Sequence, residues 1–352
     1  MDAGARRGSA RDSGLGLASL NVLVVNAGST SLKLRLVGPD DETVELGRLE
    51  DAAGRAGVVA HRIVHGGPRF REPVLIGAEV RARIEELVEL APLHNAPAWH
   101  ALREAENVFT DVPHVAVFDT AFHATIPAEA YVYAVPGAWD VRRFGFHGLS
   151  VQWSSEQVRV PRLVVCHLGG GCSVTAVRDG RSVDTTMGFT PLEGVPMATR
   201  SGSVDPGALL HVLRQGLDVD ALDAALNEHS GLTALAGTGD MRELERRDDD
   251  EATLAVSVFT YRVAAAAAAM ATACGGLDAV VFTAGIGEGS ARVRRLVCER
   301  LAFLGVELDG ERNESCEPDC DIDAGGSPVR VAVVRAREEL VAARAARALL
   351  RA

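Results

Sequence analysis

The sequence predicts an α/β protein of two similar domains, because each half of the chain opens with a strand, a small-residue turn and a second strand. In the first half, the apolar run 20–26 leads through A-G-S-T-S into residues 32–36, where leucine alternates with lysine and arginine. In the second half, residues 163–168 lead through three glycines into a returning strand at 174–177. The 352-residue length also favours two domains. The repeat indicates a duplicated fold with a phosphate-binding hairpin in each copy.

The remaining elements follow from periodicity and turn residues. Helical spacing predicts helices at residues 78–91, 208–214, 219–227 and 290–304, and an amphipathic helix at the end of the chain. Short apolar runs predict strands at 114–119, 131–135, 279–283 and 329–334, and Asp179-Gly180 predicts a tight turn. The acidic stretch 310–326 is expected to be a loop.

The apolar run 254–274 is long enough to suggest a membrane helix. Arg262 lies in its middle and many of its residues are alanine, which is only weakly hydrophobic. These features favour a buried helix of a soluble protein. Its small side chains would let another helix approach closely, for example across a dimer interface.

The composition is that of an ordinary soluble protein, with 47% hydrophobic and 24% charged residues. The net charge of −12 argues against nucleic acid as a partner, although a site can be locally positive. Six scattered cysteines are too few for a disulfide framework and fit a reducing cytosol. Cys316 and Cys320 have no second Cys/His pair nearby to complete a metal site, so a plain surface loop is expected there. Residues 1–19 lack the apolar segment of an export signal, which predicts a flexible tail and a cytoplasmic protein.

Three glycine-containing turns are candidates for phosphate binding. N-A-G-S-T-S-L-K at 26–33 offers backbone N–H groups, hydroxyls and Lys33. An ordinary hairpin turn would have the same composition. The turns L-G-G-G at 168–171 and A-G-I-G-E-G-S at 284–290 are weaker signals of the same kind.

In H-R-I-V-H-G-G, Arg62 lies at a strand end between two histidines. A zinc site made by His61, His65 and His94 would need a helix to bring the first two together, and Gly66-Gly67 opposes one.

Two further residues stand at the ends of predicted elements. Asp119 ends a buried strand, where ligand sites of α/β proteins gather, although a helix cap would also account for it. His147 follows Phe146 in a glycine-flanked turn, where a buried structural histidine is the ordinary case.

The stretch 184–206, D-T-T-M-G-F-T-P-L-E-G-V-P-M-A-T-R-S-G-S-V-D-P, has neither helical nor strand period. A long aperiodic loop in a compact chain is usually functional or disordered, and apolar anchors such as Met187 and Phe189 argue against disorder. The loop presents Arg200 between small residues, which suits binding of a planar or phosphoryl anion.

This loop closely resembles the signature loop of the acetate kinases, the acyl-phosphate-forming kinases of the acetate/propionate group. N-A-G-S-T-S-L-K likewise resembles their N-A-G-S-S-S-L-K, and the resemblance runs from about Val22 to the C-terminus. It implies two similar actin-like (ribonuclease H-like) domains with a nucleotide cleft between them. The first, trimmed domain would comprise 20–121 with 340–352, and the second 122–339.

The resemblance also implies a set of site residues. The catalytic residues would be Arg62, His94, Asp119, His147 and Arg200. ATP would be bound by Ser29, Ser31, Lys33, His167, Leu168, Gly169, Gly170, Gly171, Asp240, Met241, Arg242, Gly285, Ile286, Gly287, Glu288 and Gly289. The acid's alkyl group would lie against Val64, Leu93, Phe146 and Pro191, beside Arg62. Mg²⁺, with Mn²⁺ as an alternative, would be held near Asn26 and Glu338.

The implied activity is reversible transfer of the ATP γ-phosphoryl group to acetate, giving acetyl phosphate and ADP, by a cytoplasmic homodimer without nucleic-acid or membrane partners. A carboxyl group with a pKa near ~4 is already ionised at neutral pH. Asp119 therefore need not remove a proton, and is expected to orient Mg²⁺-bound water and the arginines. Two alternatives remain: a kinase for propionate or another short acid, and a nucleotide-binding regulator that has lost turnover.

The chain departs from the family pattern in four places. Gly170 and Gly289 stand where asparagine is usual, and Ser203 stands where aspartate is usual. Only 27 residues separate Lys33 from His61, several dozen fewer than in typical relatives. These departures bear on nucleotide affinity more than on the type of reaction.

Overall fold

The computed structural model describes residues 20–28, 32–88 and 92–351, with the side chains of residues 92–94 excepted. The chain folds into two compact units. The first comprises residues 1–118 and 338–352, and the second comprises residues 119–337. The first unit is therefore discontinuous in sequence.

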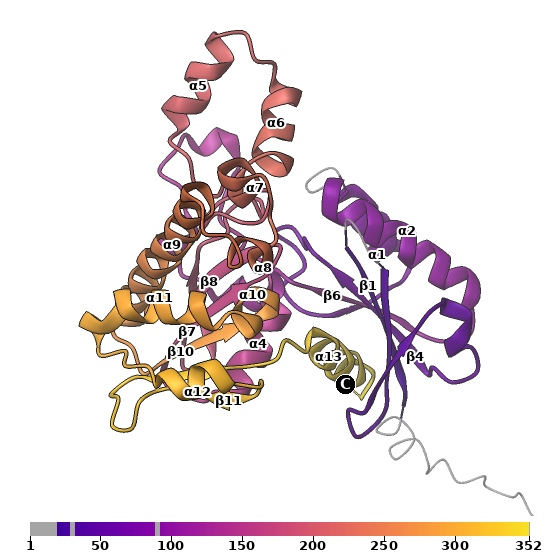
Figure 1. Cartoon of the computed structure of the whole chain (residues 1–352). Coiled ribbons are helices and arrows are strands. Elements are labelled where there is room, and N and C mark those ends of the chain that lie inside the picture. The colour runs from indigo at the N-terminus through magenta and orange to yellow at the C-terminus, as the bar shows by residue number, and fades with distance from the viewer. Residues whose placement is uncertain (1–19, 29–31, 89–91, 352) are drawn as a thin grey trace, which may run out of the picture. The chain divides into compact units, whose positions relative to one another are not determined.

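A six-stranded mixed sheet forms the centre of the first unit (Figure 1). Its strand order is β3-β2-β1-β4-β6-β5. Its strands are β1 (Val22–Ala27), β2 (Leu32–Val37), β3 (Thr43–Leu46), β4 (Val58–Ile63), β5 (Val74–Leu75) and β6 (His114–Phe118). β1 pairs with β2 as an antiparallel hairpin and with β4 as a parallel neighbour. The connection from Lys33 to His61 is compact, because β2 turns into β3 and one 3-10 turn, η1 (Leu49–Ala52), leads on to β4.

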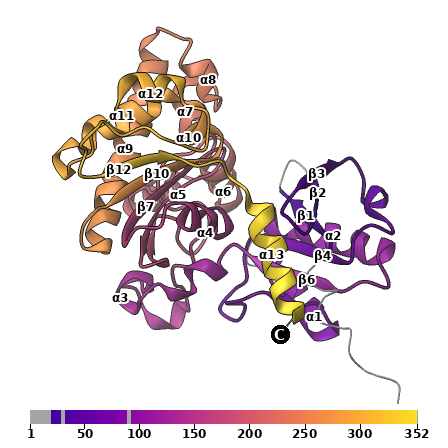
Figure 2. The ribbon, with the colours of Figure 1, turned by 90° about the horizontal axis from the view of Figure 1, so that it is seen from below.

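Helices pack on this sheet because its strands alternate their side chains between two faces. The helices are α1 (Ala78–Glu86), α2 (Pro92–Val108) and α13 (Glu338–Arg351). Leu23, Val25 and Val59 form one core cluster with α2 and η1. α13 contacts β1, β4 and β6, and it crosses the strands in Figure 2.

Two arginines anchor α13 to the β2–β3 turn. The buried Arg347 donates from Nη2 to the Val37 carbonyl at 2.9 Å, and Arg344 pairs with Asp41 at 2.7 Å. The last helix of the chain thus completes the unit that the first strand begins.

The second unit also has a six-stranded mixed sheet, in the order β11-β12-β10-β7-β8-β9. Its strands are β7 (Arg162–Leu168), β8 (Cys172–Arg178), β9 (Arg181–Thr185), β10 (Ala279–Thr283), β11 (Cys320–Asp321) and β12 (Arg330–Val333). Its helices are α3 (Ala128–Tyr131), α4 (Gly148–Gln157), α5 (Pro206–Arg214), α6 (Val219–Glu228), α7 (Gly231–Ala236), α8 (Met241–Leu244), α9 (Asp250–Cys274), α10 (Ala284–Gly289), α11 (Ala291–Leu301) and α12 (Gly310–Ser315); the 3-10 turns are η2 (Ala121–Thr125), η3 (Gly137–Trp139) and η4 (Ala302–Leu304). The two antiparallel hairpins, β1–β2 and β7–β8, open the two sheets as the repeat predicts. The fold is therefore α/β with two similar domains.

Several element predictions are wrong in detail. Residues 131–135 form no strand; α3 ends at Tyr131 and a single bridge joins Val132 to Arg142. The glycine turn at 284–289 is the short helix α10, whose last carbonyls at Gly287 and Glu288 accept hydrogen bonds from buried Arg294. Residues 310–326 include α12 and β11 as well as loop.

The cysteines bring one further correction. Cys316 and Cys320 form a disulfide, so the segment between them is not a plain loop. The other four cysteines are buried free thiols.

α9 is the one helix in the described part of the chain that is long and apolar enough to cross a membrane, judged by length and composition alone. Half of its most apolar window is buried inside the structure, and α9 packs against β7, β8 and α11. A core helix has these properties.

Candidate functional site

In the first unit, polar side chains from four elements meet beside β1 and β4. Asn26 and Arg62 are register partners on these parallel strands, so their side chains leave the same face of the sheet. Arg62 Nη1 lies 3.0 Å from Asn26 Oδ1 and 3.1 Å from Oε2 of Glu338, the first residue of α13. Lys33, exposed and opposite Asn26 on β2, continues the row. Two cations, an amide and a carboxylate therefore share one face.

This cluster offers oxygen donors of the kind that Mg²⁺ and Mn²⁺ prefer. The Arg62 and Glu338 side chains are each 16% exposed, and Asn26 Nδ2 lies 3.5 Å from Glu338 Oε2. Among the described residues, no three His, Cys, Asp or Glu side chains gather in a metal-binding group. One carboxylate with an amide oxygen fits Mg²⁺, because Mg²⁺ usually takes one or two carboxylates and fills its other positions with water and substrate phosphates.

Several predicted residues of the first unit lie outside the described part. Ser29 and Ser31 are not among the described residues, and the side chains of Leu93 and His94 are not described. Val64 follows β4 and is half-buried. Asn95 fixes the backbone next to it: buried Asn95 accepts from His65 N–H and donates to the His65 and Leu87 carbonyls, all at 3.0–3.1 Å. The sequence motif predicted the neighbouring His94 as a site residue, and Asn95 was not predicted.

In the second unit, His147 and Arg200 converge on Gly171. A Cβ atom built on Gly171 would lie 3.2 Å from His147 Nε2 and 3.6 Å from Arg200 Nη1. A side chain at residue 171 would therefore press on both groups. The glycine leaves this space open beside an imidazole nitrogen and a guanidinium.

The His147 ring is held by neighbours on two sides. His147 has left-handed backbone dihedrals (φ 59°) at the N-cap of α4. Its Nδ1 lies 3.0 Å from Oγ of buried Ser173, and its ring stacks on His167 with centroids 4.0 Å apart. His167 Nδ1 in turn lies 2.8 Å from Ser150 Oγ. With Nδ1 engaged by a hydroxyl, Nε2 is the nitrogen directed at Gly171.

Asp119 lies at the start of the second unit and is fully buried. Its backbone carbonyl sits where a Cβ on Gly148 would be, 1.9 Å away, so only glycine is tolerated next to His147. Burial lowers the pKa of His123 to about 4, and both the Phe146 carbonyl and the Asp119 charge oppose that shift. His123 bridges the Phe146 carbonyl and Ser182 Oγ at 2.9 Å each, which pins the turn carrying His147.

The Arg200 loop is tied to the glycine hairpin of β7–β8. Ala198 N–H donates to the Gly170 carbonyl at 3.3 Å. Ser203, the residue that replaces aspartate, accepts from Gly194 N–H at 3.1 Å and so closes the loop. Arg200 Nη1 donates to the Pro191 carbonyl at 3.3 Å, and burial lowers the pKa of the guanidinium. An arginine stays charged after such a shift, so a half-buried cation is presented toward Gly171.

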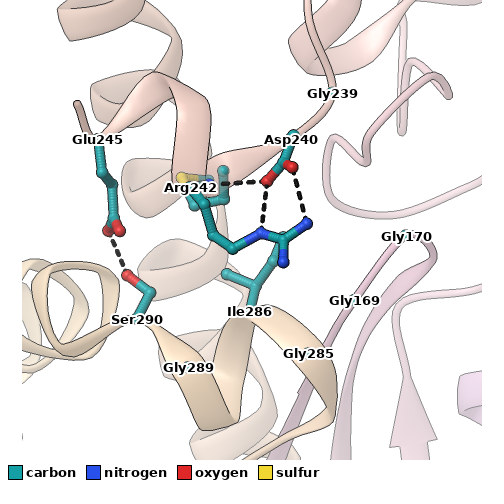
Figure 3. Close-up of a pocket in the computed structure, with 11 residues that line it drawn as sticks. Gly169, Gly170, Gly239, Asp240, Arg242, Glu245, Gly285, Ile286, Gly289 and Ser290 are labelled. Carbon is teal, nitrogen blue, oxygen red and sulfur yellow. Dashed lines mark hydrogen bonds and ion pairs between the residues drawn. The ribbon is translucent and has the colours of Figure 1, made fainter. Parts of the chain in front are cut away.

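A cavity of about 420 Å³ lies beside the same hairpin (Figure 3). Its wall consists of Gly169, Gly170, Gly239, Asp240, Met241, Arg242, Glu245, Gly285, Ile286, Gly289 and Ser290. The glycines expose backbone to any ligand, while Ile286 and Met241 supply apolar surface. The volume is within the usual range for small-molecule sites, roughly 300–1,000 Å³.

Two pairs of polar side chains line this cavity, Asp240 with Arg242 and Glu245 with Ser290 (Figure 3). Asp240 caps α8, and Arg242 returns to it with Nε 3.0 Å from Oδ1 and Nη2 2.8 Å from Oδ2. The hydrogen bonds from Arg242 lower the pKa of Asp240, so this carboxylate stays ionised at neutral pH. Ser290 donates a short hydrogen bond to Glu245, as Figure 3 shows. Glu245 was not predicted, and Gly239 and Ser290 were not named among the ATP-binding residues.

Eight of the predicted nucleotide residues line the cavity: Gly169, Gly170, Asp240, Met241, Arg242, Gly285, Ile286 and Gly289. His167, Leu168, Gly171, Gly287 and Glu288 do not. Leu168 is core, and His167 is the stacking partner of His147. The Glu288 carboxylate accepts hydrogen bonds from the N–H groups of Ala284 and Ala336, so its side chain holds these two backbone segments together.

The predicted alkyl pocket draws on both units. Arg62 and Val64 belong to the first unit. Phe146 and Pro191 belong to the second unit, and both are buried. Phe146 precedes His147 in the sequence, and the Pro191 carbonyl accepts a hydrogen bond from Arg200. The pocket stays a prediction.

The sequence profile of the Acetokinase family matches residues 48–344. The acetate kinase of Synechococcus sp. (strain JA-2-3B'a(2-13)) is 46% identical over 319 residues, 86% of this chain and 79% of the relative. The acetate kinase of Clavibacter sepedonicus is 41% identical over 385 residues, covering 92% of this chain and 97% of the relative. That alignment is longer than this chain, so the relative has stretches without a counterpart here.

Solved structures agree with the sequence comparisons. A propionate kinase from Francisella tularensis superposes with a TM-score of 0.87 at 34% identity, covering 93% of this chain and 98% of its own. The acetate kinase of Porphyromonas gingivalis gives a TM-score of 0.84 at 32% identity, covering 94% and 100%.

Proposed function

Because this chain belongs to the acetokinase family, we propose that it transfers the γ-phosphoryl group of ATP to acetate, giving acetyl phosphate and ADP, in a reversible reaction. The observation that supports this best is the convergence of His147 Nε2 and Arg200 Nη1 over Gly171, next to the glycine-walled cavity. A cavity for a nucleotide and a cationic position for a transferring phosphoryl group thus adjoin the same hairpin.

The protein takes little part in the covalent chemistry of this reaction. A carboxylate oxygen of acetate attacks the γ-phosphorus, and the bond from phosphorus to the bridging oxygen of ADP breaks in line with it. Acetate is ionised at neutral pH, so no base is needed. Arg200 neutralises charge on the equatorial oxygens, and His147 donates a hydrogen bond from Nε2 to the same group. Arg62 is proposed to bind the carboxylate, and Asp119 to orient the polar groups around it.

Asn26 and Glu338 would hold Mg²⁺ or Mn²⁺, in part through water. When bound to the nucleotide, the ion neutralises phosphate charge. The protein's part is to present one carboxylate and one amide oxygen at a fixed place, and Arg62 keeps both in position.

The cavity is proposed to bind the adenosine part of ATP. Ile286 and Met241 suit an apolar base, and Asp240 and Glu245 are acceptors for hydroxyl or amino groups. Gly169 and Gly170 would let phosphates approach the backbone.

Propionate is the second candidate acid, because the Francisella protein that matches this fold at a TM-score of 0.87 is a propionate kinase. One methylene is worth only ~1–3 kcal/mol of discrimination. We therefore expect acetate to be preferred by tens of fold while propionate is still used. Val64→Ala should narrow that ratio of kcat/KM by making room for the methylene.

The deciding experiment is a coupled ADP assay on the purified protein with Mg-ATP and acetate or propionate, together with trapping of the acyl phosphate by hydroxylamine. We expect ADP and acyl hydroxamate in equal amounts. ADP without hydroxamate would indicate ATP hydrolysis and reject the acyl kinase. Neither product would also reject it and favour a nucleotide-binding regulator without turnover.

We also propose that the protein works as a cytoplasmic homodimer. Leu254 and Tyr261 on α9 are 55% and 54% exposed, and the alanines that follow would let a second helix approach closely. Light scattering on the eluted protein should give twice the monomer mass of 37.1 kDa.

A further inference from the structure

The six cysteines, all within the described residues, differ sharply in their surroundings. Cys166, Cys172, Cys274 and Cys298 are buried thiols, and burial raises the pKa of each, for example to about 12 for Cys172 and Cys298. Such thiols are inert because the thiolate is the reactive form. Cys316 and Cys320 are half-buried, bonded to each other and separated by exposed Glu317 and Asp319. This disulfide is the sulfur pair that a reagent in solution can reach.

The disulfide closes a short loop that binds the segment 335–337 through hydrogen bonds and an ion pair. Asp319 Oδ1 accepts from Arg335 N–H at 2.8 Å, and Asp319 Oδ2 pairs with Arg337 at 3.0 Å. Arg335 Nη2 also donates to the Pro318 carbonyl at 3.4 Å. Three contacts from the disulfide loop therefore reach two residues.

Glu288 of α10 holds the middle residue of the same segment, Ala336. Glu288 Oε1 accepts from Ala336 N–H at 2.9 Å and from Ala284 N–H at 3.0 Å. Arg337 also lies over the Trp153 ring, 5.6 Å from its centroid. The next residue in the chain is Glu338, whose carboxylate pairs with Arg62. Segment 335–337 therefore leads directly into the proposed metal carboxylate.

We propose that Cys316–Cys320 is a thiol–disulfide exchange site for dithiol reductants, through which the redox state around the protein sets how firmly the segment before Glu338 is held. The functional part of this inference rests on the proposed role of Glu338. With the disulfide intact, the loop is constrained and Asp319 is placed to bind Arg335 and Arg337. After reduction the loop gains conformational freedom, and those contacts weaken.

The dithiol reductant supplies the electrons and protons that this exchange needs. A thiolate of the dithiol attacks one cystine sulfur, the S–S bond breaks, and the released cysteine thiolate takes a proton. The second thiol of the reductant then displaces the first sulfur and closes its own disulfide. Two electrons and two protons pass to Cys316 and Cys320, and the reductant is oxidised.

Hydrogen exchange at single amides tests the structural step. The full-length protein is compared with and without dithiothreitol, which changes no other cysteine because the other four are already thiols. Reduction should speed exchange of the Arg335 amide by about tenfold, since it loses a fixed acceptor. The Val334 amide, bonded to the Phe282 carbonyl at 3.0 Å, is the internal control and should not change. Equal exchange at Arg335 in both forms would overturn the proposal.

Variants identify the residues responsible. Cys316→Ser with Cys320→Ser should exchange at the reduced rate with or without dithiothreitol. Asp319→Ala keeps the disulfide but removes the acceptor of the Arg335 N–H, so it should show fast exchange at Arg335 before any reduction. If Asp319→Ala behaves like the unaltered protein, Asp319 does not transmit the redox state and the inference is wrong.

The consequence for the site is read from the apparent affinity for Mg²⁺ at fixed ATP. Reduction should weaken it by about two- to fivefold with kcat nearly unchanged, because an exposed ion pair shifts an equilibrium by no more than about that factor. Faster exchange with unchanged Mg²⁺ affinity would refute the link to Glu338. If acetate is not phosphorylated in either form, the proposed function fails, and the amide exchange still decides whether reduction frees segment 335–337.

Discussion

Arg200 is the residue on which the proposed reaction depends most. Its guanidinium is half-buried beside the space left by Gly171, with Nη1 on the Pro191 carbonyl. Arg200→Ala should lower kcat by on the order of 10³-fold, as loss of other arginine clamps on a phosphoryl group does. Arg200→Lys should recover only part of it, because an ammonium lacks the planar fork. The measurement is steady-state kinetics, with exposed Arg214→Ala in α5 as the matched control. Near-normal turnover of folded Arg200→Ala would remove the arginine from the mechanism.

Ser173 is expected to set the tautomer of His147. Ser173 Oγ lies 3.0 Å from Nδ1, and we expect its hydroxyl to donate to that nitrogen. This would keep the neutral imidazole protonated at Nε2, the nitrogen beside Gly171. Ser173→Ala should lower kcat about tenfold, the equivalent of one hydrogen bond of about 1–1.5 kcal/mol. It should also raise the Nδ1–H form in ¹⁵N spectra of His147. Ser150→Ala, which alters the stacked His167, should leave that tautomer unchanged. A normal tautomer in Ser173→Ala would contradict the assignment.

Gly170 and Gly289 test the departures from the family pattern. A Cβ added at either position meets no atom within 4 Å, and neither glycine has left-handed φ, so both accept a side chain. Gly170→Asn and Gly289→Asn should each lower KM for Mg-ATP by a factor of about two to ten, the worth of one hydrogen bond. Gly310→Asn, equally unhindered but outside the cavity, serves as the control. Unchanged nucleotide affinity in both cavity variants would show that the lost amides do not matter.

At the scale of elements, buried histidines connect strands and make stability depend on pH. On β4, His61 Nε2 lies 2.9 Å from Nδ1 of His114 on β6, and burial with the His114 charge lowers the pKa of His61 to about 3. His123 in η2 has a pKa of about 4 for the same main cause. The unfolded chain binds these protons near pH 6.5 and the folded chain does not. Stability is therefore full above about pH 6.5 and falls as the pH drops toward 4.

Each histidine should lower the free energy of unfolding by on the order of 2 kcal/mol at pH 5 relative to pH 7. Urea denaturation followed by circular dichroism between pH 7.5 and 5 measures this loss. The window lies above the range where the carboxylates with lowered pKa, Asp240 and Asp278, begin to titrate. A denaturation midpoint that stays constant down to pH 5 would disprove the linkage.

Periodicity predicted the elements whose own sequence determines them and missed those fixed by distant contacts. α9 and the two hairpins carry unbroken patterns and were predicted correctly. α2 was missed because Pro92 and Pro97 interrupt its pattern, although a proline early in a helix leaves few hydrogen bonds unmade. α10 was missed because half of it is glycine and its end is held by Arg294, which no local pattern reveals.

At the scale of the whole molecule, motifs predicted the family and the α/β fold of two similar domains. They also predicted most of the glycine and α8 residues of the cavity. Glu245, Ser290 and Asn95 escaped, since each matters through a partner far away in sequence. The disulfide was missed for a different reason. The cysteine count indicates the redox compartment of a protein, but it does not show whether one pair of cysteines four residues apart is bonded.

The discontinuity of the first unit has a consequence during synthesis. On the ribosome, β1 to β6 emerge first, yet α13 emerges only after all of residues 119–337. Until residues 338–351 have been translated, the nascent first sheet lacks the helix that contacts β1, β4 and β6, and Arg347 cannot yet reach the Val37 carbonyl. The second unit is contiguous and can fold while the first waits. A stop codon at position 338 should therefore release a protein whose second unit resists protease while residues 20–118 are digested, and the ribosome would be the place where chaperones meet this chain.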